Sequence, residues 1–136
     1  MPEATRKTVM VVEEEDNLRA LLRDILAGKG FAVIDAGTGQ IAIELAEGHR
    51  GTIDLLITDL ILRGMSGVDV SREVARGNPA LKTLYLEDHS PSTMISRGIP
   101  LTGLEYLAKP VKLKALVAKV YELLEMTGDD EGSAHR

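Results

Sequence analysis

Hydrophobic residues occur along this chain in two alternating patterns. Short uninterrupted apolar runs are followed by longer stretches in which apolar residues recur every three or four positions. The first pattern is typical of buried strands, and the second is typical of helices with one apolar face. The runs predict strands at Val9–Val12, Ala32–Asp35, Ile53–Thr58, Leu81–Leu86 and Leu104–Leu107.

Helix signals follow each predicted strand. Asp16 or Asn17 is placed to cap the first helix and Thr38 the second, and Pro91 suits the first turn of a short helix. Successive strand–helix units predict an α/β fold, a doubly wound parallel sheet with helices on both faces. The predicted helices are Asp16–Lys29, Thr38–Gly48, Val68–Arg76, Ser92–Arg97 and Lys112–Met126.

Size and composition indicate one globular domain over residues 8–126. The chain has 136 residues, 44% of them hydrophobic and 27% charged, which is enough apolar material for a single core. Residues 1–7 and 127–136 are polar and aperiodic, so we expect flexible ends there. No apolar run approaches the roughly 18 residues of a membrane span. Since no charged-then-apolar leader opens the chain, we expect a cytoplasmic protein without membrane contact.

Composition also narrows the chemistry. The chain has no cysteine, which removes disulfides, thiolate metal sites and thiol nucleophiles. Its formal net charge is −5 and its basic residues are scattered, whereas phosphate backbones are bound by a clustered basic face. One Phe and three Tyr are too few aromatic residues to form a stacking platform for single-stranded nucleic acid. We therefore expect no direct nucleic-acid partner.

Acidic residues follow two of the predicted strands directly, and a lysine follows a third. The third strand ends at Asp59, the first is followed by Glu13, Glu14 and Glu15, and Lys109 comes after the last. If the strands are parallel, their carboxyl ends share one edge of the sheet, where open α/β folds bind ligands. We therefore expect acids from two strands to meet a lysine from another.

Such an acidic cluster needs a counter-charge. Two carboxylates within about 4 Å repel by roughly 4 kcal/mol at an effective dielectric near 20. Oxygen ligands without His or Cys favour Mg²⁺. An ionised Asp59 beside Mg²⁺ and Lys109 is a competent nucleophile toward phosphorus and would form an aspartyl phosphate. Simpler interpretations remain: Asp59 could cap the following loop, the acids could form a solvated turn at a helix start, and Lys109 could be an ordinary exposed lysine.

Three motifs lie at these strand ends. They are VMVVEEE at Val9–Glu15, ITDLILRGMSG at Ile57–Gly67 and YLAKP at Tyr106–Pro110. In this order and spacing, the chain resembles the receiver domain of response regulators in bacterial two-component signalling, over about residues 8–126. The resemblance implies a flavodoxin-like, five-stranded sheet of order 2-1-3-4-5. The segment around the short fourth helix is similar to receivers of hybrid histidine kinases, from which the chain could be excised.

The resemblance also implies roles for individual residues. Asp59 would be the phosphoacceptor and Lys109 the phosphate-binding lysine. The Mg²⁺ ligands would be Glu13, Glu14, Asp59 and the main-chain carbonyl of Ile61, and Tyr106 would be the switch aromatic. The implied function is that of a non-enzymatic signalling domain. It would take a phosphoryl group from a histidine kinase or histidine phosphotransfer protein and act through contacts with a downstream protein, possible homodimers included.

Three positions depart from the family pattern. The residue that closes the fourth strand is usually Ser or Thr, whose hydroxyl binds a phosphoryl oxygen, but here it is Glu87. An ionised carboxylate cannot donate that hydrogen bond and carries like charge. Glu14 stands where Asp is usual, and Arg63 replaces a common proline.

Glu87 leaves several interpretations open. It could pair with Lys109 and hold an unphosphorylated state, point into solvent, or weaken phosphorylation without abolishing it. Tyr106 would then be either a packing residue or a switch, and we expect His49 and His89 to be surface residues. The main functional alternative is a pseudo-receiver, an interaction module of the same fold whose state phosphate does not set. A flavodoxin-like flavin protein is more distant, because no Ser- or Thr-rich loop follows the first strand.

Overall fold

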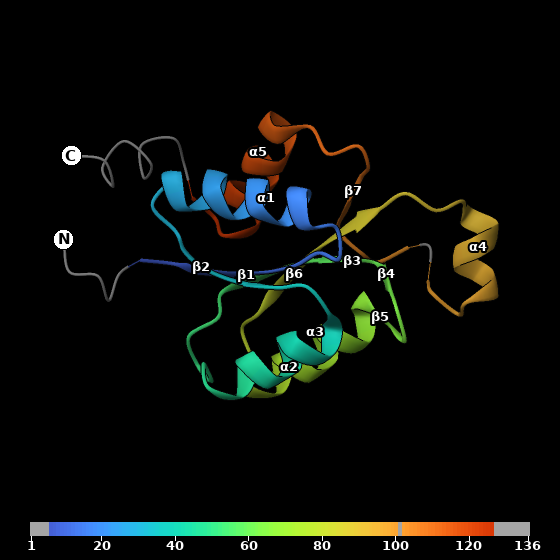
Figure 1. Cartoon of the computed structure of the whole chain (residues 1–136), viewed down its shortest axis with the longest axis horizontal. Coiled ribbons are helices and arrows are strands. Elements are labelled where there is room, and N and C mark those ends of the chain that lie inside the picture. The colour runs from blue at the N-terminus through green and yellow to red at the C-terminus, as the bar shows by residue number, and fades with distance from the viewer. Residues whose placement is uncertain (1–5, 101, 127–136) are drawn as a thin grey trace.

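Five parallel strands form the central sheet of the computed structural model, which describes residues 6–100 and 102–126 (Figure 1). The strand order is β2-β1-β3-β6-β7, and every neighbouring pair is parallel. Since β6 and β7 are the fourth and fifth strands of this sheet, the predicted order 2-1-3-4-5 is confirmed. The strands are β1 (Thr8–Val12), β2 (Ala32–Ala36), β3 (Leu55–Asp59), β6 (Lys82–Glu87) and β7 (Tyr106–Ala108).

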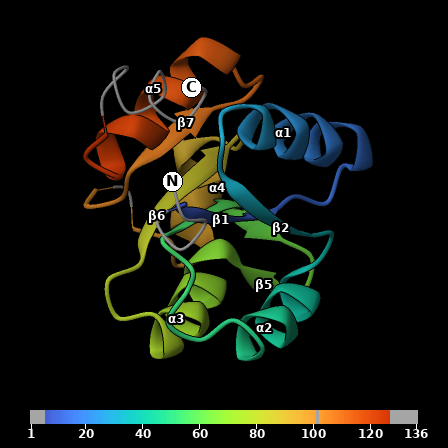
Figure 2. The same ribbon diagram turned by 90° about the vertical axis from the view of Figure 1, so that its left-hand side faces the viewer.

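Helices cover both faces of the sheet, as predicted. In Figures 1 and 2, α1 and α5 lie on one face and α2 and α3 lie on the other, whereas α4 lies at one end of the molecule. The helices are α1 (Asp16–Gly28), α2 (Gly39–Glu47), α3 (Gly67–Gly77), α4 (Pro91–Ser96) and α5 (Leu113–Leu123).

The central strands are buried on both faces, which explains their uninterrupted apolar sequences. Along β1, Val9 and Val11 belong to the cluster that includes apolar residues of α1 and α5. Met10 and Val12 point the other way, into the cluster with α2 and α3. Every residue of β3 is buried, including Thr58 and Asp59 at its carboxyl end. A polar residue at this end is therefore fixed in place by the core behind it.

Helix starts agree with the sequence at one position and differ at another. Thr38 caps α2, because its hydroxyl accepts the N–H of Ile41 at 3.1 Å. The cap of α1 is Glu15 and not Asp16 or Asn17: its carboxylate accepts the N–H groups of Asn17 and Leu18. The longer Glu side chain reaches back over the first turn, so the helix includes Asp16 as its first residue.

Two short strands occupy a segment that the sequence left as a loop. β4 (Ile61–Leu62) and β5 (Met65–Ser66) form an antiparallel hairpin, with Gly64 at φ 79°. The last sheet strand also begins later than predicted, at Tyr106 instead of Leu104, because Leu104 packs against the buried cluster that includes α4. The hairpin and this late strand both lie beside the edge at which β3 ends.

The ends of the chain are only partly described. Residues 1–5 and 127–136, most of the two predicted flexible ends, lie outside the described residues. The carbonyl of Lys7 accepts the N–H of Ala32 at 2.9 Å, so contact with the sheet begins one residue before the predicted domain boundary. Within residues 6–100 and 102–126, no helix is long and apolar enough to span a bilayer.

Candidate functional site

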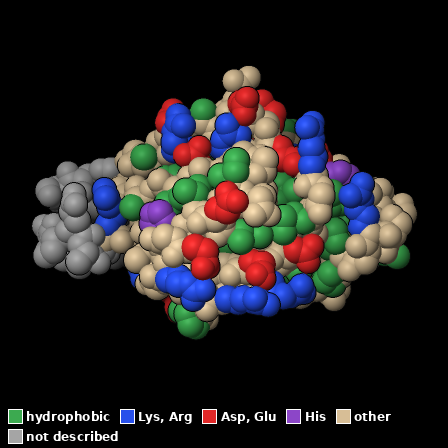
Figure 3. Space-filling view, turned by 60° about the horizontal axis from the view of Figure 1, so that its bottom comes forward, with side chains coloured by type: hydrophobic (Ala, Val, Ile, Leu, Met, Phe, Trp, Pro, Cys, Tyr) green, Lys and Arg blue, Asp and Glu red, His purple; other side chains and the backbone are tan. Residues whose placement is uncertain are grey.

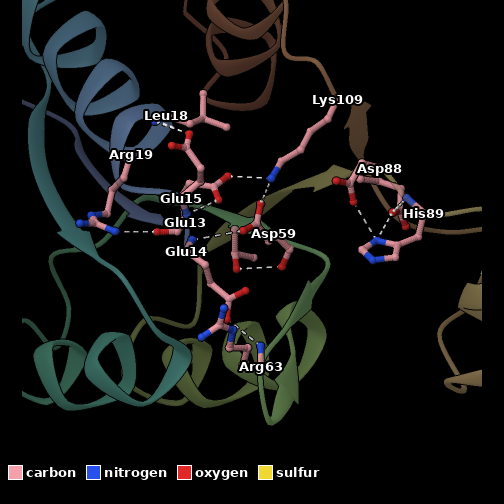
Figure 4. A network of polar contacts seen from close by, with 12 residues as sticks. Glu13, Glu14, Glu15, Leu18, Arg19, Asp59, Arg63, Asp88, His89 and Lys109 are labelled. Carbon is pink, nitrogen blue, oxygen red and sulfur yellow. Dashed lines mark hydrogen bonds and ion pairs between the residues drawn. The ribbon is translucent and has the colours of Figure 1, made fainter.

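The carboxyl ends of β1, β3, β6 and β7 surround one open cavity of about 220 Å³. The cavity is polar, because charged residues follow each of these strands. Figure 4 shows that acidic side chains from the ends of β1 and β3 converge on the ammonium group of a lysine beyond β7. The lining residues are Glu13, Glu14, Glu15, Asp59, Ile61, Leu86, Asp88, His89 and Lys109.

Asp59 is held at this edge by a close approach of backbone. The N–H of Gly67, at the start of α3, donates to the carbonyl of Leu60 at 2.7 Å. A Cβ atom at position 67 would lie 2.2 Å from the carbonyl oxygen of Asp59, so only glycine allows α3 to begin here. The glycine that ends the second motif thus fixes the backbone of Asp59.

Lys109 joins the two buried acids. Its Nζ lies 2.7 Å from Asp59 Oδ1 and 2.9 Å from Glu13 Oε1. The other carboxylate oxygen of Glu13 accepts the N–H of Glu15 at 2.9 Å. The backbone places the lysine through a hydrogen bond of 2.8 Å from its N–H to the carbonyl of Glu87 and a cis peptide bond to Pro110. The structure therefore brings together the acids and the lysine that the sequence selected.

This arrangement shifts the pKa values of its members. Burial, and then the hydrogen bond and charge of Glu13, raise the pKa of Asp59 from 3.8 to about 7, although Lys109 opposes the shift. Burial alone would lower the pKa of Lys109, but the carboxylates of Asp59 and Glu13 raise it above its ordinary value. Lys109 therefore stays cationic at neutral pH, and Asp59 titrates there.

Glu14 departs from the expected position. Its carboxylate accepts the N–H of Arg63 at 2.7 Å and points away from Lys109 in Figure 4. Only the backbone N–H of Glu14 approaches Asp59, at 3.4 Å from Oδ2. The extra methylene of Glu, relative to the usual Asp, carries the carboxylate past the cavity to the β4–β5 hairpin. Ile61 lies in that hairpin and lines the cavity as expected.

The donor set fits a hard divalent cation. Glu13 is 1% exposed and Asp59 6% exposed, so two carboxylates are buried against one ammonium group. Among the described residues, Glu13 Oε1 and Asp59 Oδ1 have no hydrogen-bond partner beyond that ion pair. Oxygen ligands with excess negative charge are those that Mg²⁺ prefers. Glu13 and Asp59 face the cavity that Ile61 also lines, whereas the carboxylate of Glu14 is bonded to the N–H of Arg63.

The observed contacts of Glu87 contradict two of the arrangements predicted for it. It makes no ion pair with Lys109 among the described contacts, and it does not point into solvent, since it is only 6% exposed. Instead, its Oε1 accepts the backbone N–H of His89 and lies 3.0 Å from His89 Nδ1. The chain turns directly after β6, so the residue two positions on folds back over the carboxylate.

His89 is exposed, as the sequence suggested, and it also contacts two acidic side chains. Its ring is partly exposed, yet Nδ1 also lies 2.9 Å from Asp88 Oδ1. The signal was present in the sequence as three adjacent polar residues, Glu87, Asp88 and His89, at a strand end. His49 has no such setting: its Nδ1 lies 2.8 Å from the carbonyl oxygen of Leu45, within its own helix turn. Tyr106 is 46% exposed and is not a packed core residue.

A model of the response regulator receiver domain family matches residues 9–121 of this sequence. The chain belongs to that family. Its receiver fold is also that of a solved receiver domain from the hybrid histidine kinase CckA, with a TM-score of 0.71 and 28% identity over 86% of this chain and 98% of that one.

Other relatives of this receiver domain differ in length and role. The sensor kinase CckA of Brucella abortus is 30% identical over 87% of this chain. The response regulator TrrA of Thermotoga maritima, solved in complex with Mg²⁺–BeF, is 30% identical with a TM-score of 0.65, over 86% of this chain and 98% of that one. The chain spans only 12% to 54% of the length of the curated relatives compared, so their whole activities do not follow from this domain.

Proposed function

We propose that this receiver domain accepts a phosphoryl group from a phosphohistidine on Asp59. The observation that carries the proposal is the contact of a buried, strand-end carboxylate with Lys109 Nζ at 2.7 Å, beside a second buried acid. Burial, together with the hydrogen bond and charge of Glu13, raises the pKa of Asp59 to about 7, and a carboxylate with so perturbed a pKa at a cavity is typical of functional sites. Membership in the receiver family supports phosphoryl transfer as the reaction, and the contact with Lys109 supports Asp59 as the acceptor.

The phosphoryl transfer follows from these positions. An ionised oxygen of Asp59 attacks phosphorus, the bond from phosphorus to the donor imidazole nitrogen breaks, and that nitrogen keeps the electron pair and takes up a proton. The ammonium group of Lys109 stabilises the negative charge on the phosphoryl oxygens. Asp59 must be ionised to attack, so the burial and the charge of Glu13 that raise its pKa oppose the reaction, and a cation beside the carboxylate favours it.

Glu13, Asp59 and the carbonyl of Ile61 would hold Mg²⁺. The ion would supply positive charge that lowers the pKa of Asp59 and offsets repulsion between the acids and the incoming phosphoryl group. Glu14 would join once its carboxylate leaves the N–H of Arg63, which lies 2.7 Å away. Lys109 keeps the two buried acids together and neutralises part of their charge.

A histidine kinase or a histidine phosphotransfer protein would be the donor, in the cytoplasm. Relatives that carry this domain include a sensor kinase, a context in which the phosphohistidine is close at hand. The output would be contact with a downstream protein. Figure 3 supports this over nucleic acid, because acidic side chains lie across the face shown and basic ones lie along its lower and upper margins, without a continuous basic surface on this face.

The test is intact mass after incubation with acetyl phosphate and Mg²⁺. We expect one phosphoryl adduct on the native chain, no adduct on Asp59→Asn, and an unchanged adduct on Asp54→Asn. Asp54 is a matched control because it also lies beside β3 but at the opposite end, where its carboxylate accepts the N–H of Thr8 at 2.8 Å. An adduct that persists in Asp59→Asn would contradict the assignment.

A pseudo-receiver is the second candidate, and Glu87 favours it. Its carboxylate occupies the position of the family's hydroxyl and is buried beneath His89. If a folded native chain gains no adduct from acetyl phosphate or from a phosphorylated kinase, the domain signals without phosphate. Binding of beryllofluoride with Mg²⁺ would then also be absent.

A further inference from the structure

The turn after β6 gathers three possible metal ligands at one side of the cavity, none of which forms an ion pair with Asp59 or Lys109 among the described residues. Glu87, Asp88 and His89 each offer one ligand atom, and these atoms all lie within 4.8 Å of one another. We call these residues the β6-end cluster. It differs from the pocket chemically because it includes an imidazole nitrogen, and spatially because it lies to one side of Lys109 in Figure 4.

The spacing of the ligand atoms suits a small divalent ion. His89 Nδ1 lies 2.9 Å from Asp88 Oδ1 and 3.0 Å from Glu87 Oε1. Two ligand atoms on a tetrahedral ion with bonds of about 2.1 Å are about 3.4 Å apart, so these atoms need to separate by only about half an ångström to hold one. One N–H hydrogen cannot point at both oxygens at full strength, whereas an ion between the three atoms satisfies all of them.

Glu87 supplies an independent observation. Only 6% of its surface is exposed, and its Oε2 has no hydrogen-bond partner among the described residues. A buried carboxylate with one unsatisfied oxygen is costly, because it has lost water without gaining a full set of partners. A bound cation would compensate this charge.

We propose that the β6-end cluster binds a divalent first-row transition-metal ion such as Zn²⁺. The ligands would be the carboxylate of Glu87, Asp88 Oδ1 and His89 Nδ1. A mixed imidazole and carboxylate set favours Zn²⁺ over Mg²⁺, whose preferred ligands are all oxygen. Asp88 and His89 are exposed, so water completes the coordination.

The location gives this site a consequence for its neighbour. Asp88 and His89 line the same cavity as Asp59 and Lys109. An ion there would neutralise Glu87, the residue whose negative charge opposes a phosphoryl group at Asp59. Binding of Zn²⁺ itself does not depend on the function proposed for Asp59.

Calorimetric titration of the metal-free full chain with Zn²⁺, in buffer that holds saturating Mg²⁺, tests the site. We expect one Zn²⁺ per chain, with affinity reduced by more than about tenfold in His89→Gln and in Asp88→Asn. His49→Gln and His135→Gln are the matched histidine controls and should bind like the native chain. Thermal unfolding of each variant shows that it is folded.

Other results overturn the proposal. No Zn²⁺ binding to the native chain, or equal binding by His89→Gln, removes the β6-end cluster as a site. Loss of binding in Asp59→Asn with retention in His89→Gln would place Zn²⁺ in the acidic pocket instead. Loss in His135→Gln alone would assign it to the C-terminal segment.

Discussion

Two charged clusters lie at one edge of the sheet, and they are built in opposite ways. The Asp59 pocket joins Glu13, Asp59 and Lys109 from the ends of three different strands, so it exists only when the sheet is complete. The β6-end cluster consists of three consecutive residues and needs only a local turn. A change of charge in the long-range cluster should therefore alter the stability of the whole fold. A change of charge in the local cluster should have little effect on that stability.

The counter-charges differ as well. In the pocket, two buried carboxylates share an ammonium group whose own pKa is raised by them. In the β6-end cluster, a buried carboxylate faces an imidazole that is charged only when protonated. The first arrangement contains a permanent cation, Lys109, whereas the second has no lysine or arginine among the ion-pair partners of Glu87 in the described part of the chain.

Removal of the lysine should have the largest effect on stability. Lys109→Met leaves Glu13 and Asp59 buried without a counter-charge, and we expect a loss of about 3 kcal/mol in the free energy of unfolding at pH 8. The loss should shrink at pH 5, because the acids can then take up protons. Urea unfolding at both pH values measures it.

The matched control is Lys119→Met. Lys119 also pairs with two acids, Glu122 at 3.1 Å and Glu105 at 3.6 Å, but both acids are exposed. Its removal should cost far less than that of Lys109, and the loss in the free energy of unfolding should be nearly the same at both pH values. Equal losses in the free energy of unfolding for the two lysine variants would show that the ion pairs of the pocket stabilise the fold no more than surface ion pairs do.

Neutralisation of Asp59 should act in the opposite direction. Its pKa is about 7 in the native state and 3.8 ordinarily, so the native state holds a proton that the unfolded state has released between these values. The free energy of unfolding therefore falls as pH rises through that window. Asp59→Asn removes this loss, and we expect it to stabilise the protein by about 1 to 2 kcal/mol at pH 8, since solvent at the cavity mouth screens part of the effect.

The gain of Asp59→Asn should disappear near pH 4, where Asp59 is neutral in both states. Thermal unfolding of native and variant chains across pH 4 to 8, without divalent ions, gives the comparison. A stability difference that does not change with pH would mean that Asp59 is ionised throughout, and its interaction with Lys109 would then outweigh burial.

The sequence predicted the long-range cluster better than the local one. Parallel strands must end at a common edge, so Glu13, Asp59 and Lys109 could be placed together from strand positions alone. The direction in which each side chain points at this edge was harder to predict. The carboxylate of Glu14 bonds the backbone of Arg63 because of a hairpin, β4–β5, that the sequence left as a loop.

The fate of Glu87 depended on a detail that hydrophobic patterns do not encode. One interpretation paired it with Lys109, because the two residues lie at the ends of neighbouring strands. The lysine instead lies 2.7 Å from Asp59 and 2.9 Å from Glu13, and the turn after β6 supplies His89 to Glu87. Periodicity fixes which face a residue occupies, but a turn of two residues decides which group covers it.

Substitutions of Glu87 should have a smaller effect and show whether the two clusters communicate. Glu87→Thr removes a buried charge and adds a hydroxyl that can donate a hydrogen bond toward a phosphoryl group. We expect the affinity for beryllofluoride with Mg²⁺ to rise about tenfold, or about 1.4 kcal/mol. Fluorine-19 NMR or calorimetry of the native chain and the variant measures this change.

Glu87→Gln separates the two causes, because it removes the charge and keeps the size without adding a hydroxyl. If repulsion from Glu87 is what weakens the pocket, Gln should recover most of the gain seen with Thr. If the missing hydroxyl is what matters, Gln should recover little, since it does not supply one. Equal affinity in all three chains would separate the clusters: the Asp59 pocket would then act alone, and the charge at the end of β6 would have no part in phosphate binding.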